Sequence, residues 1–159
     1  MAAKAHEYGA AISWTGNLGQ GTANYRGYAR NWQVKTPGKP VIECSNDPLL
    51  GGDPKLHNPE DMLLASLSAC HMLWYLHLAS EAGVVVTAYS DHPLGVGEVE
   101  PSGAGRFLSA TLRPKVTITV HSDTQKARAI HEEIHAYCFI ARSMSFPVYY
   151  EPETIVEPA

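Results

Sequence analysis

The sequence has few cysteines and no cluster of positive charge. Only three cysteines occur in 159 residues, which is too few for a disulfide-stapled secreted scaffold. The formal net charge is -4 and Lys and Arg form no run, so we expect no nucleic-acid partner. The first residues lack the apolar core of a secretory signal, so we expect a cytoplasmic protein. In that compartment a useful cysteine pair would serve redox chemistry or metal binding.

Charged residues are also missing from residues 62–80. About 20 apolar residues can span a bilayer, so a membrane helix has to be considered. The segment nevertheless contains Ser66, Ser68, His71 and His77, and acidic residues stand directly at its start. A helix that is apolar all round is also typical of the central helix of a soluble protein. We therefore expect a buried core helix and no membrane partner.

The order of the expected elements predicts an α+β protein. Hydrophobic residues make up 45% of the chain, which fits one domain over residues 1–159. We expect a first helix over 58–83 and a second from 122 or 123 to about 141, with loops at 37–58 and 92–105. Strands are expected between and around them, at 8–15, 30–36, 84–90, 107–120 and 147–156, with Pro114 at an edge or a bend. Strands and helices thus share one layered core.

The first helix has clear end signals. Asn58 is a favourable N-cap and Pro59 suits the first helical position. Glu60 and Asp61 complement the positive end of the helix dipole, and Gly83 supplies the C-terminal stop. A helix of this length would extend roughly 36 Å and would carry Cys70 near its middle.

The second helix is expected to place another cysteine in the interior. Apolar residues recur there at helical spacing and define a buried stripe: Ala127, Ile130, Ile134, Cys138 and Ala141. Both Cys70 and Cys138 should therefore face the core from helices. The residues alone leave two readings open, since the two thiols could approach bonding distance or could merely fill space.

The second helix also contains a zinc-site pattern. His131, Glu132 and His135 match H-E-x-x-H, in which two histidines bind zinc and the glutamate activates a water. A catalytic zinc needs a third protein ligand, and no histidine follows His135. Zinc hydrolysis is therefore a minor alternative, and we expect no metal and no cofactor.

Two stretches carry a family resemblance. NPEDMLLASLSACHMLWYL (58–76) resembles the first-cysteine helix of the osmotically inducible protein C / organic hydroperoxide resistance (OsmC/Ohr) family, with Asn58, Pro59 and Glu60 ahead of Cys70. HAYCFIARSMSFPV (135–148) is similar to the family's second-cysteine helix. The resemblance implies an OsmC-like fold in an intertwined homodimer. In that fold, antiparallel sheets surround a long buried central helix that carries Cys70, and a second helix carries Cys138.

The resemblance implies a thiol-dependent peroxidase that prefers organic hydroperoxides. Cys70 would attack the peroxide as a thiolate and become a sulfenic acid. Cys138 would resolve it to a disulfide, which an external dithiol reduces, either a small molecule or a lipoyl-type protein. Cys44 matches no motif and is expected to be incidental.

The family's activating arginine, held by the motif glutamate Glu60, has two candidates here. Arg26 and Arg30 both follow the Gly-rich loop, and Arg26 is our choice because it comes sooner. Glu60 and Cys70 would stand roughly 15 Å apart along one straight helix. Within one chain, one arginine therefore touches both only if something bends. If Glu60 instead reaches Cys70 of a second subunit, the difficulty disappears, which again predicts a homodimer.

Aromatic residues suggest an apolar substrate pocket. Trp74 and Tyr75 follow Cys70 and could bind a bulky peroxide, with Trp14 and Trp32 as further candidates. Aromatic residues are more often plain core, and fold alone does not establish function. The main alternative is therefore a small-molecule binding protein that keeps both cysteines for packing.

Overall fold

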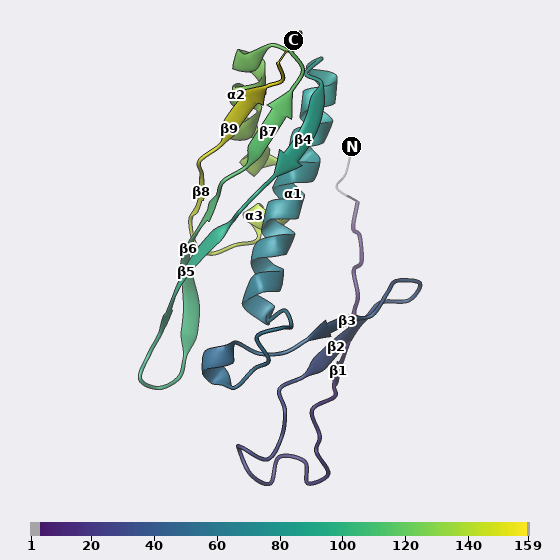
Figure 1. Cartoon of the computed structure of the whole chain (residues 1–159), viewed down its shortest axis with the longest axis vertical. Helices are drawn as coiled ribbons and strands as arrows, with labels where there is room; N and C mark the ends of the chain where they lie inside the picture. The colour runs from purple at the N-terminus through teal and green to yellow at the C-terminus, as the bar shows by residue number, and fades with distance from the viewer. Residues whose placement is uncertain (1–3, 159) are drawn as a thin grey trace. The chain divides into compact units, whose positions relative to one another are not determined.

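The computed structural model describes residues 4–158, which fall into two compact units (Figure 1). The first unit ends at Met62 and the second begins at Leu63, so the boundary lies inside helix α1 (Pro59–Glu81). The single-domain expectation for residues 1–159 stays a prediction.

The N-terminal unit is a small antiparallel sheet. Strands β1 (Ala11–Trp14), β2 (Trp32–Lys35) and β3 (Ile42–Cys44) lie in that order, and Trp14 pairs with Trp32. Strand β3 and the 3-10 helix η1 (Pro48–Leu50) fall where the Pro- and Gly-rich composition predicted only loop. The loop prediction over 37–58 is wrong at these points, because pairing with β2 overrides the local turn signals.

Helix α1 begins as the sequence predicts. The side chain of Asn58 accepts a hydrogen bond from the Asp61 amide at 2.7 Å, and Asp61 accepts one from the Asn58 amide at 3.3 Å. This reciprocal arrangement satisfies two amides at the start of the helix. After the last helical residue, Gly83 has a φ of 72°, which a glycine adopts without strain.

The burial of α1 differs from the expectation. Only Leu67, His71, Tyr75 and Ala79 are buried, at a spacing of four residues along one face. Only 22% of the most apolar window of the helix is buried, although its length and composition match a membrane span. The expectation of a buried core helix therefore holds for one face of α1, because the chain supplies cover for that face only.

Two three-stranded sheets build the C-terminal unit. One has the order β4 (Val86–Ser90), β7 (Lys115–Ile118), β9 (Glu153–Val156), and the other β5 (Leu94–Val99), β6 (Gly105–Leu112), β8 (Val148–Tyr150). Figure 1 shows β5 and β6 as a long hairpin. The sheets are not purely antiparallel as predicted, because β8 runs parallel to β6 and β9 parallel to β7. The helical segment before β8 provides the long crossover that parallel pairing requires.

Some predicted elements are split or were missed. Residues 92–105, for which a loop or a wide hairpin turn was expected, contain strand β5 and the turn of its hairpin with β6, because the glycines of β5 masked the strand signal. The predicted strand 107–120 breaks at Arg113–Pro114 into β6 and β7, which confirms the bend expected at Pro114. The predicted strand 147–156 divides in the same way into β8 and β9.

The second helix ends earlier than predicted. Helix α2 (Thr124–Glu133) runs into a 3-10 turn, η2 (Ile134–Ala136), and a new short helix, α3 (Phe139–Arg142), follows. The chain breaks at Cys138, whose ψ of 107° is extended rather than helical. The predicted apolar stripe is nonetheless buried in full, from Ala127 to Ala141.

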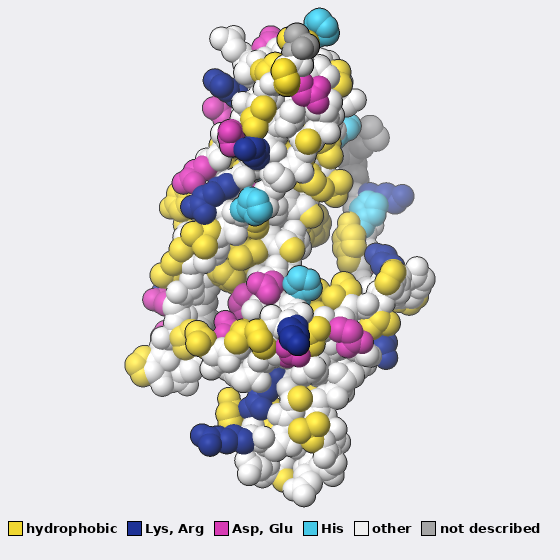
Figure 2. Space-filling model, in the orientation of Figure 1, with side chains coloured by type: hydrophobic (Ala, Val, Ile, Leu, Met, Phe, Trp, Pro, Cys, Tyr) yellow, Lys and Arg dark blue, Asp and Glu magenta, His cyan; other side chains and the backbone are white. Residues whose placement is uncertain are grey.

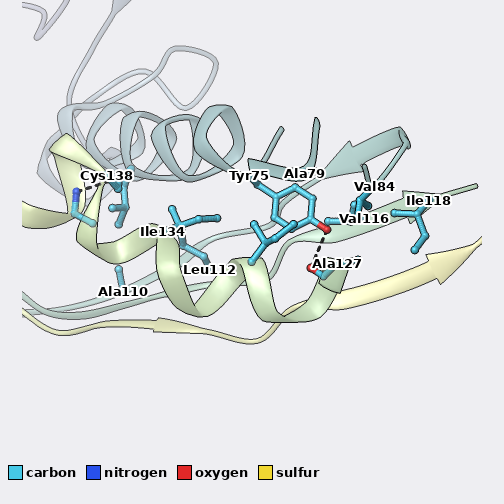
Figure 3. Packing of buried hydrophobic residues seen from close by; sticks show 13 residues of the cluster. Tyr75, Ala79, Val84, Ala110, Leu112, Val116, Ile118, Ala127, Ile134 and Cys138 are labelled. Atoms are coloured by element: carbon cyan, nitrogen blue, oxygen red, sulfur yellow. Dashed lines mark hydrogen bonds between the residues drawn. The ribbon is translucent and has the colours of Figure 1, made fainter. Parts of the chain in front are cut away.

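The hydrophobic core of the C-terminal unit lies between α1, the sheets and α2 (Figure 3). Tyr75 is fully buried, and its hydroxyl donates a hydrogen bond to the Ala127 carbonyl at 3.0 Å. This bond satisfies the one polar atom of the Tyr75 side chain and ties α1 to α2. The core thereby fixes the relative positions of the two helical segments that carry Cys70 and Cys138.

Candidate active site

Two cysteines from distant parts of the chain meet at the core of the C-terminal unit. Cys70 is half-buried on α1, at the edge of the buried face that Leu67 and His71 define. Cys138 is fully buried at the start of α3, where its sulfur accepts a hydrogen bond from the Ala141 amide at 3.4 Å (Figure 3). Cys70 packs against the core cluster that contains Cys138, and its thiol is near enough to raise the pKa of the Cys138 thiol.

The environment of Cys138 opposes ionisation. Burial is the largest cause that raises the pKa of its thiol, and the neighbouring Cys70 side chain raises it further. The Ala141 amide acts in the opposite direction because it favours the charged sulfur. Cys138 is therefore a neutral thiol near pH 7, whereas the half-buried Cys70 is open to reagents from solvent.

Tyr150 stands beside the two thiols at the end of β8. Its hydroxyl lies 3.0 Å from Nδ1 of His135. Its ring stacks on His71, with 4.9 Å between the ring centroids. Burial raises the pKa of Tyr150 to about 12, and the nearby charges of Cys138 and Cys70 act in the same direction. The phenol is therefore a protonated hydroxyl close to both sulfurs.

A pair of buried histidines extends this cluster. Nε2 of His71 lies 3.0 Å from Nδ1 of His131, and both side chains are almost wholly buried. Burial lowers the pKa of His71 to about 4, partly opposed by Asp91. Burial and the neighbouring His71 lower the pKa of His131 to about 3. Both rings are consequently neutral near pH 7 and share one hydrogen bond.

The H-E-x-x-H pattern is used in a different way from a zinc site. His131 points into the core and bonds to His71, whereas His135 is exposed and bonds to Tyr150. Glu132 and Glu133 are exposed. Within residues 4–158, no group of three or more His, Cys, Asp or Glu side chains is arranged to hold a metal ion. The zinc alternative therefore has no donor set in the described part of the chain.

The two aromatic residues predicted to line a pocket have different surroundings. Trp74 is half-buried, stacks on Tyr137 with 5.2 Å between ring centroids, and borders a shallow surface hollow with Leu73 and His77. Tyr75 belongs to the core and stacks on His131. Trp74 therefore reaches the surface of α1, whereas Tyr75 packs inside the core.

The predicted activating residues all lie in the N-terminal unit. Glu60 is exposed in the first turn of α1. Arg26 is exposed, and its backbone amide is hydrogen-bonded to Asn24. Arg30 is fixed more firmly, because its guanidinium donates to the carbonyls of Tyr25 and Tyr28 at 2.7 Å each and lies over both rings.

The third cysteine, Cys44, has the surroundings of a packing residue. Cys44 is fully buried at the end of β3, and its sulfur lies 3.6 Å from that of Met62. These contacts are what a packing cysteine makes.

Three members of the cluster were missed by sequence reasoning. Tyr150 sits in a tail strand with no motif, and only the structure brings it to the thiols. His71 had a usable signal, because it lies four residues from both Leu67 and Tyr75 on the buried face of α1. His135 was predicted as a possible zinc ligand within the H-E-x-x-H pattern.

Comparisons with known proteins agree with this fold. The sequence model described as OsmC-like protein matches residues 52–152. No curated protein matches the chain at a significant level. An OsmC-like protein of unknown function from Vibrio cholerae is 27% identical, with a TM-score of 0.83 over 93% of this chain and 99% of that one.

Two more distant structures share the fold. An organic hydroperoxide resistance protein from Elizabethkingia anophelis is 17% identical, with a TM-score of 0.66 over 96% of this chain and 99% of its own. The organic hydroperoxide resistance protein OhrB of Bacillus subtilis is 16% identical, with a TM-score of 0.59 over 92% and 98%.

Proposed function

Because the chain belongs to the family of OsmC-like proteins, we propose that it is a thiol-dependent peroxidase that reduces organic hydroperoxides. The packing of Cys70 against the core cluster that contains Cys138 carries this proposal. The two thiols come from segments 68 residues apart in sequence, yet both pack in the same core, near enough for Cys70 to raise the pKa of Cys138. Cysteines that only fill space have no need to meet in pairs.

The proposed chemistry has two steps. The Cys70 thiolate attacks the O–O bond, releases an alcohol and becomes a sulfenic acid. Cys138 then displaces the sulfenic oxygen to form a disulfide, and an external dithiol, a small molecule or a lipoyl-type protein, restores both thiols. The exposure of the two cysteines supports this order, because Cys70 is half-buried and Cys138 fully buried.

Thiolate formation at Cys70 calls for a cation in an otherwise apolar place. We propose that an arginine held by Glu60 of a second subunit supplies it in a homodimer. Arg26 remains our choice, since its exposed side chain can reorient. Arg30 is the alternative, because its guanidinium is already positioned by two carbonyls and two rings. The rate of the first step, measured in Arg26→Ala and in Arg30→Ala, distinguishes the two candidate arginines.

The substrate class follows from the surface near Cys70. Trp74, four residues further along α1, borders the apolar hollow on the surface of the helix. An alkyl or aryl peroxide would gain apolar contacts there that hydrogen peroxide lacks. Two structures of the same fold bear the name organic hydroperoxide resistance protein, which supports this choice. A cytoplasmic location, where dithiol reductants are available, completes the proposal.

Peroxide consumption tests the proposed function. Purified protein, an organic hydroperoxide and a dithiol are mixed, and peroxide loss is followed for the wild type and Cys70→Ser. The wild type should turn over repeatedly and Cys70→Ser should show only background loss, because no thiolate remains to attack. Cys44→Ala is the matched control and should keep its activity, since Cys44 contacts Ile42 and Met62 instead.

A different outcome points to the alternative function. If the wild type consumes no peroxide, or Cys70→Ser matches it, the peroxidase proposal fails. A small-molecule binding protein on the same fold would then account for the cysteine pair as packing.

A further inference from the structure

The proposed peroxidase cycle requires a proton transfer at a buried position. When Cys138 attacks the sulfenic acid, its sulfur forms the S–S bond and loses a proton. The S–O bond of Cys70 breaks, and the oxygen leaves with both bonding electrons and needs a proton to become water. The sulfur of Cys138 is oxidised and that of Cys70 is reduced, by one oxidation number each. The step is therefore balanced once the proton of the Cys138 thiol reaches the oxygen that leaves Cys70. Cys138 is fully buried, which keeps bulk water from carrying that proton directly.

Tyr150 is placed to carry this proton. Its side chain and that of Cys70 pack against the same core cluster that contains Cys138. Both sulfurs are near enough for their charges to raise the pKa of its phenol. Stacking on His71 holds the ring in place, with 4.9 Å between centroids. A phenol that stays protonated can donate its proton to one partner while its oxygen accepts a proton from another partner.

His135 fixes the orientation of this hydroxyl. Its Nδ1 lies 3.0 Å from the Tyr150 oxygen, and its exposed ring connects the group to solvent. With Nδ1 protonated, His135 donates to the phenol oxygen and leaves the phenol proton directed elsewhere. On the other side, His71 is held in turn by its hydrogen bond to His131. Both histidines of the H-E-x-x-H pattern thus support Tyr150, His135 directly and His131 through His71.

We propose that the Tyr150 hydroxyl transfers the proton in the disulfide-forming step, and that His135 positions it. The phenol proton moves to the oxygen that leaves Cys70 as the Cys138 thiol proton moves to the phenol oxygen. Tyr150 is regenerated and one water is released. The inference rests on the proposed peroxidase function and adds a third residue to the two-cysteine reaction.

Tyr150→Phe tests the transfer, because it removes only the hydroxyl and keeps the ring on His71. The protein receives one equivalent of an organic hydroperoxide without reductant. Peroxide loss reports the first step, and mass spectrometry of samples quenched with a sulfenic-acid trap reports the second. Peroxide loss should stay within about twofold of the wild type, whereas disulfide formation should slow by about tenfold or more. Tyr149→Phe is the control on the exposed side of the same strand and should behave like the wild type.

The pH profile separates proton transfer from a structural effect. The titratable groups around Tyr150 are Cys70 and His71 on α1, His135 on η2, Cys138 before α3, and Glu151, which is paired with Arg113. In the wild type, disulfide formation should vary little between about pH 6 and 8, because the proton is recycled internally. In Tyr150→Phe it should rise by about tenfold per pH unit, since the neutral thiol must now lose its proton to solvent.

His135 variants test the positioning role. His135→Ala should slow disulfide formation, and His135→Asn should restore most of the rate because its amide can still donate from a similar place. The proposal is overturned if Tyr150→Phe forms the disulfide at the wild-type rate and with the wild-type pH profile. Equal rates for His135→Ala and the wild type would overturn the role of His135. A wild type that consumes no peroxide would instead refute the peroxidase function itself.

Discussion

The buried histidines make the stability of the C-terminal unit sensitive to acid. In the unfolded chain a histidine has a pKa of about 6.5, whereas burial lowers the pKa of His71 to about 4 and of His131 to about 3. As pH falls from neutrality, the unfolded state therefore binds protons that the folded state does not. The free energy of unfolding must decrease over this window and recover as pH rises.

We predict that His131→Phe weakens this pH dependence. The phenyl ring keeps the stack on Tyr75 but removes one titrating group. Between pH 7 and 5, the free energy of unfolding should fall by about 2 kcal/mol less than in the wild type. Urea titrations at the two pH values measure this difference. His121→Phe, at an exposed histidine, serves as the control. Identical pH dependence in the wild type and His131→Phe would contradict the prediction.

Cys138→Ser should separate the two thiol steps. Cys70 can still attack, so about one peroxide per chain is consumed. The sulfenic acid then has no neighbouring thiol and more peroxide should oxidise it to the sulfinic level. Intact-mass spectrometry with rising peroxide distinguishes the species by their added oxygen atoms. Oxidation of Cys138 before Cys70 in the wild type would reverse the assignment.

At the scale of elements, local signals predicted the helix that carries Cys70 but not the backbone around Cys138. The ends of α1 depend on Asn58, Pro59 and Gly83, whose effects act within a few residues. The apolar stripe of the second helix was predicted from its spacing. The prediction of one continuous helix was wrong, because the backbone of Cys138 is extended and Cys138 is the N-cap of α3. Tyr150 was missed because parallel pairing with Leu112 is a long-range contact without a local signature.

Strand β5 illustrates how packing overrides a turn signal, and it yields a prediction. A Cβ at Gly95 would lie 2.4 Å from the Phe107 ring and 3.1 Å from Leu64. Gly95→Ala should therefore lower the free energy of unfolding by about 1–3 kcal/mol. Gly97→Ala in the same strand is the matched control, since its nearest contact is the Arg106 carbonyl at 3.2 Å and the loss should be smaller. Equal losses in denaturant titrations would contradict overpacking.

At the scale of the whole molecule, α1 is the element whose apolar surface one chain covers only in part. It is long and apolar, but only one face is buried, and hydrophobic side chains reach the surface of the molecule (Figure 2). Leu73 and Leu76 remain 63% and 37% exposed. Such a surface usually binds another protein or a membrane. The distance from Glu60 to Cys70 along the helix favours a second copy of this chain, because an activating pair from the partner could then reach the thiol.

The last prediction concerns this second copy. Light scattering of the wild type should give twice the mass of one chain, without detergent, at micromolar concentration. Leu73→Glu places a charge on the apolar face and should shift the protein to monomers, since an unpaired buried charge is costly at an interface. Leu49→Glu is the control, because Leu49 is 93% exposed on η1 and the dimer should persist. Peroxide reduction should fall together with dimer content if Glu60 acts across the interface. A wild type that is monomeric and fully active would show that each chain activates its own Cys70.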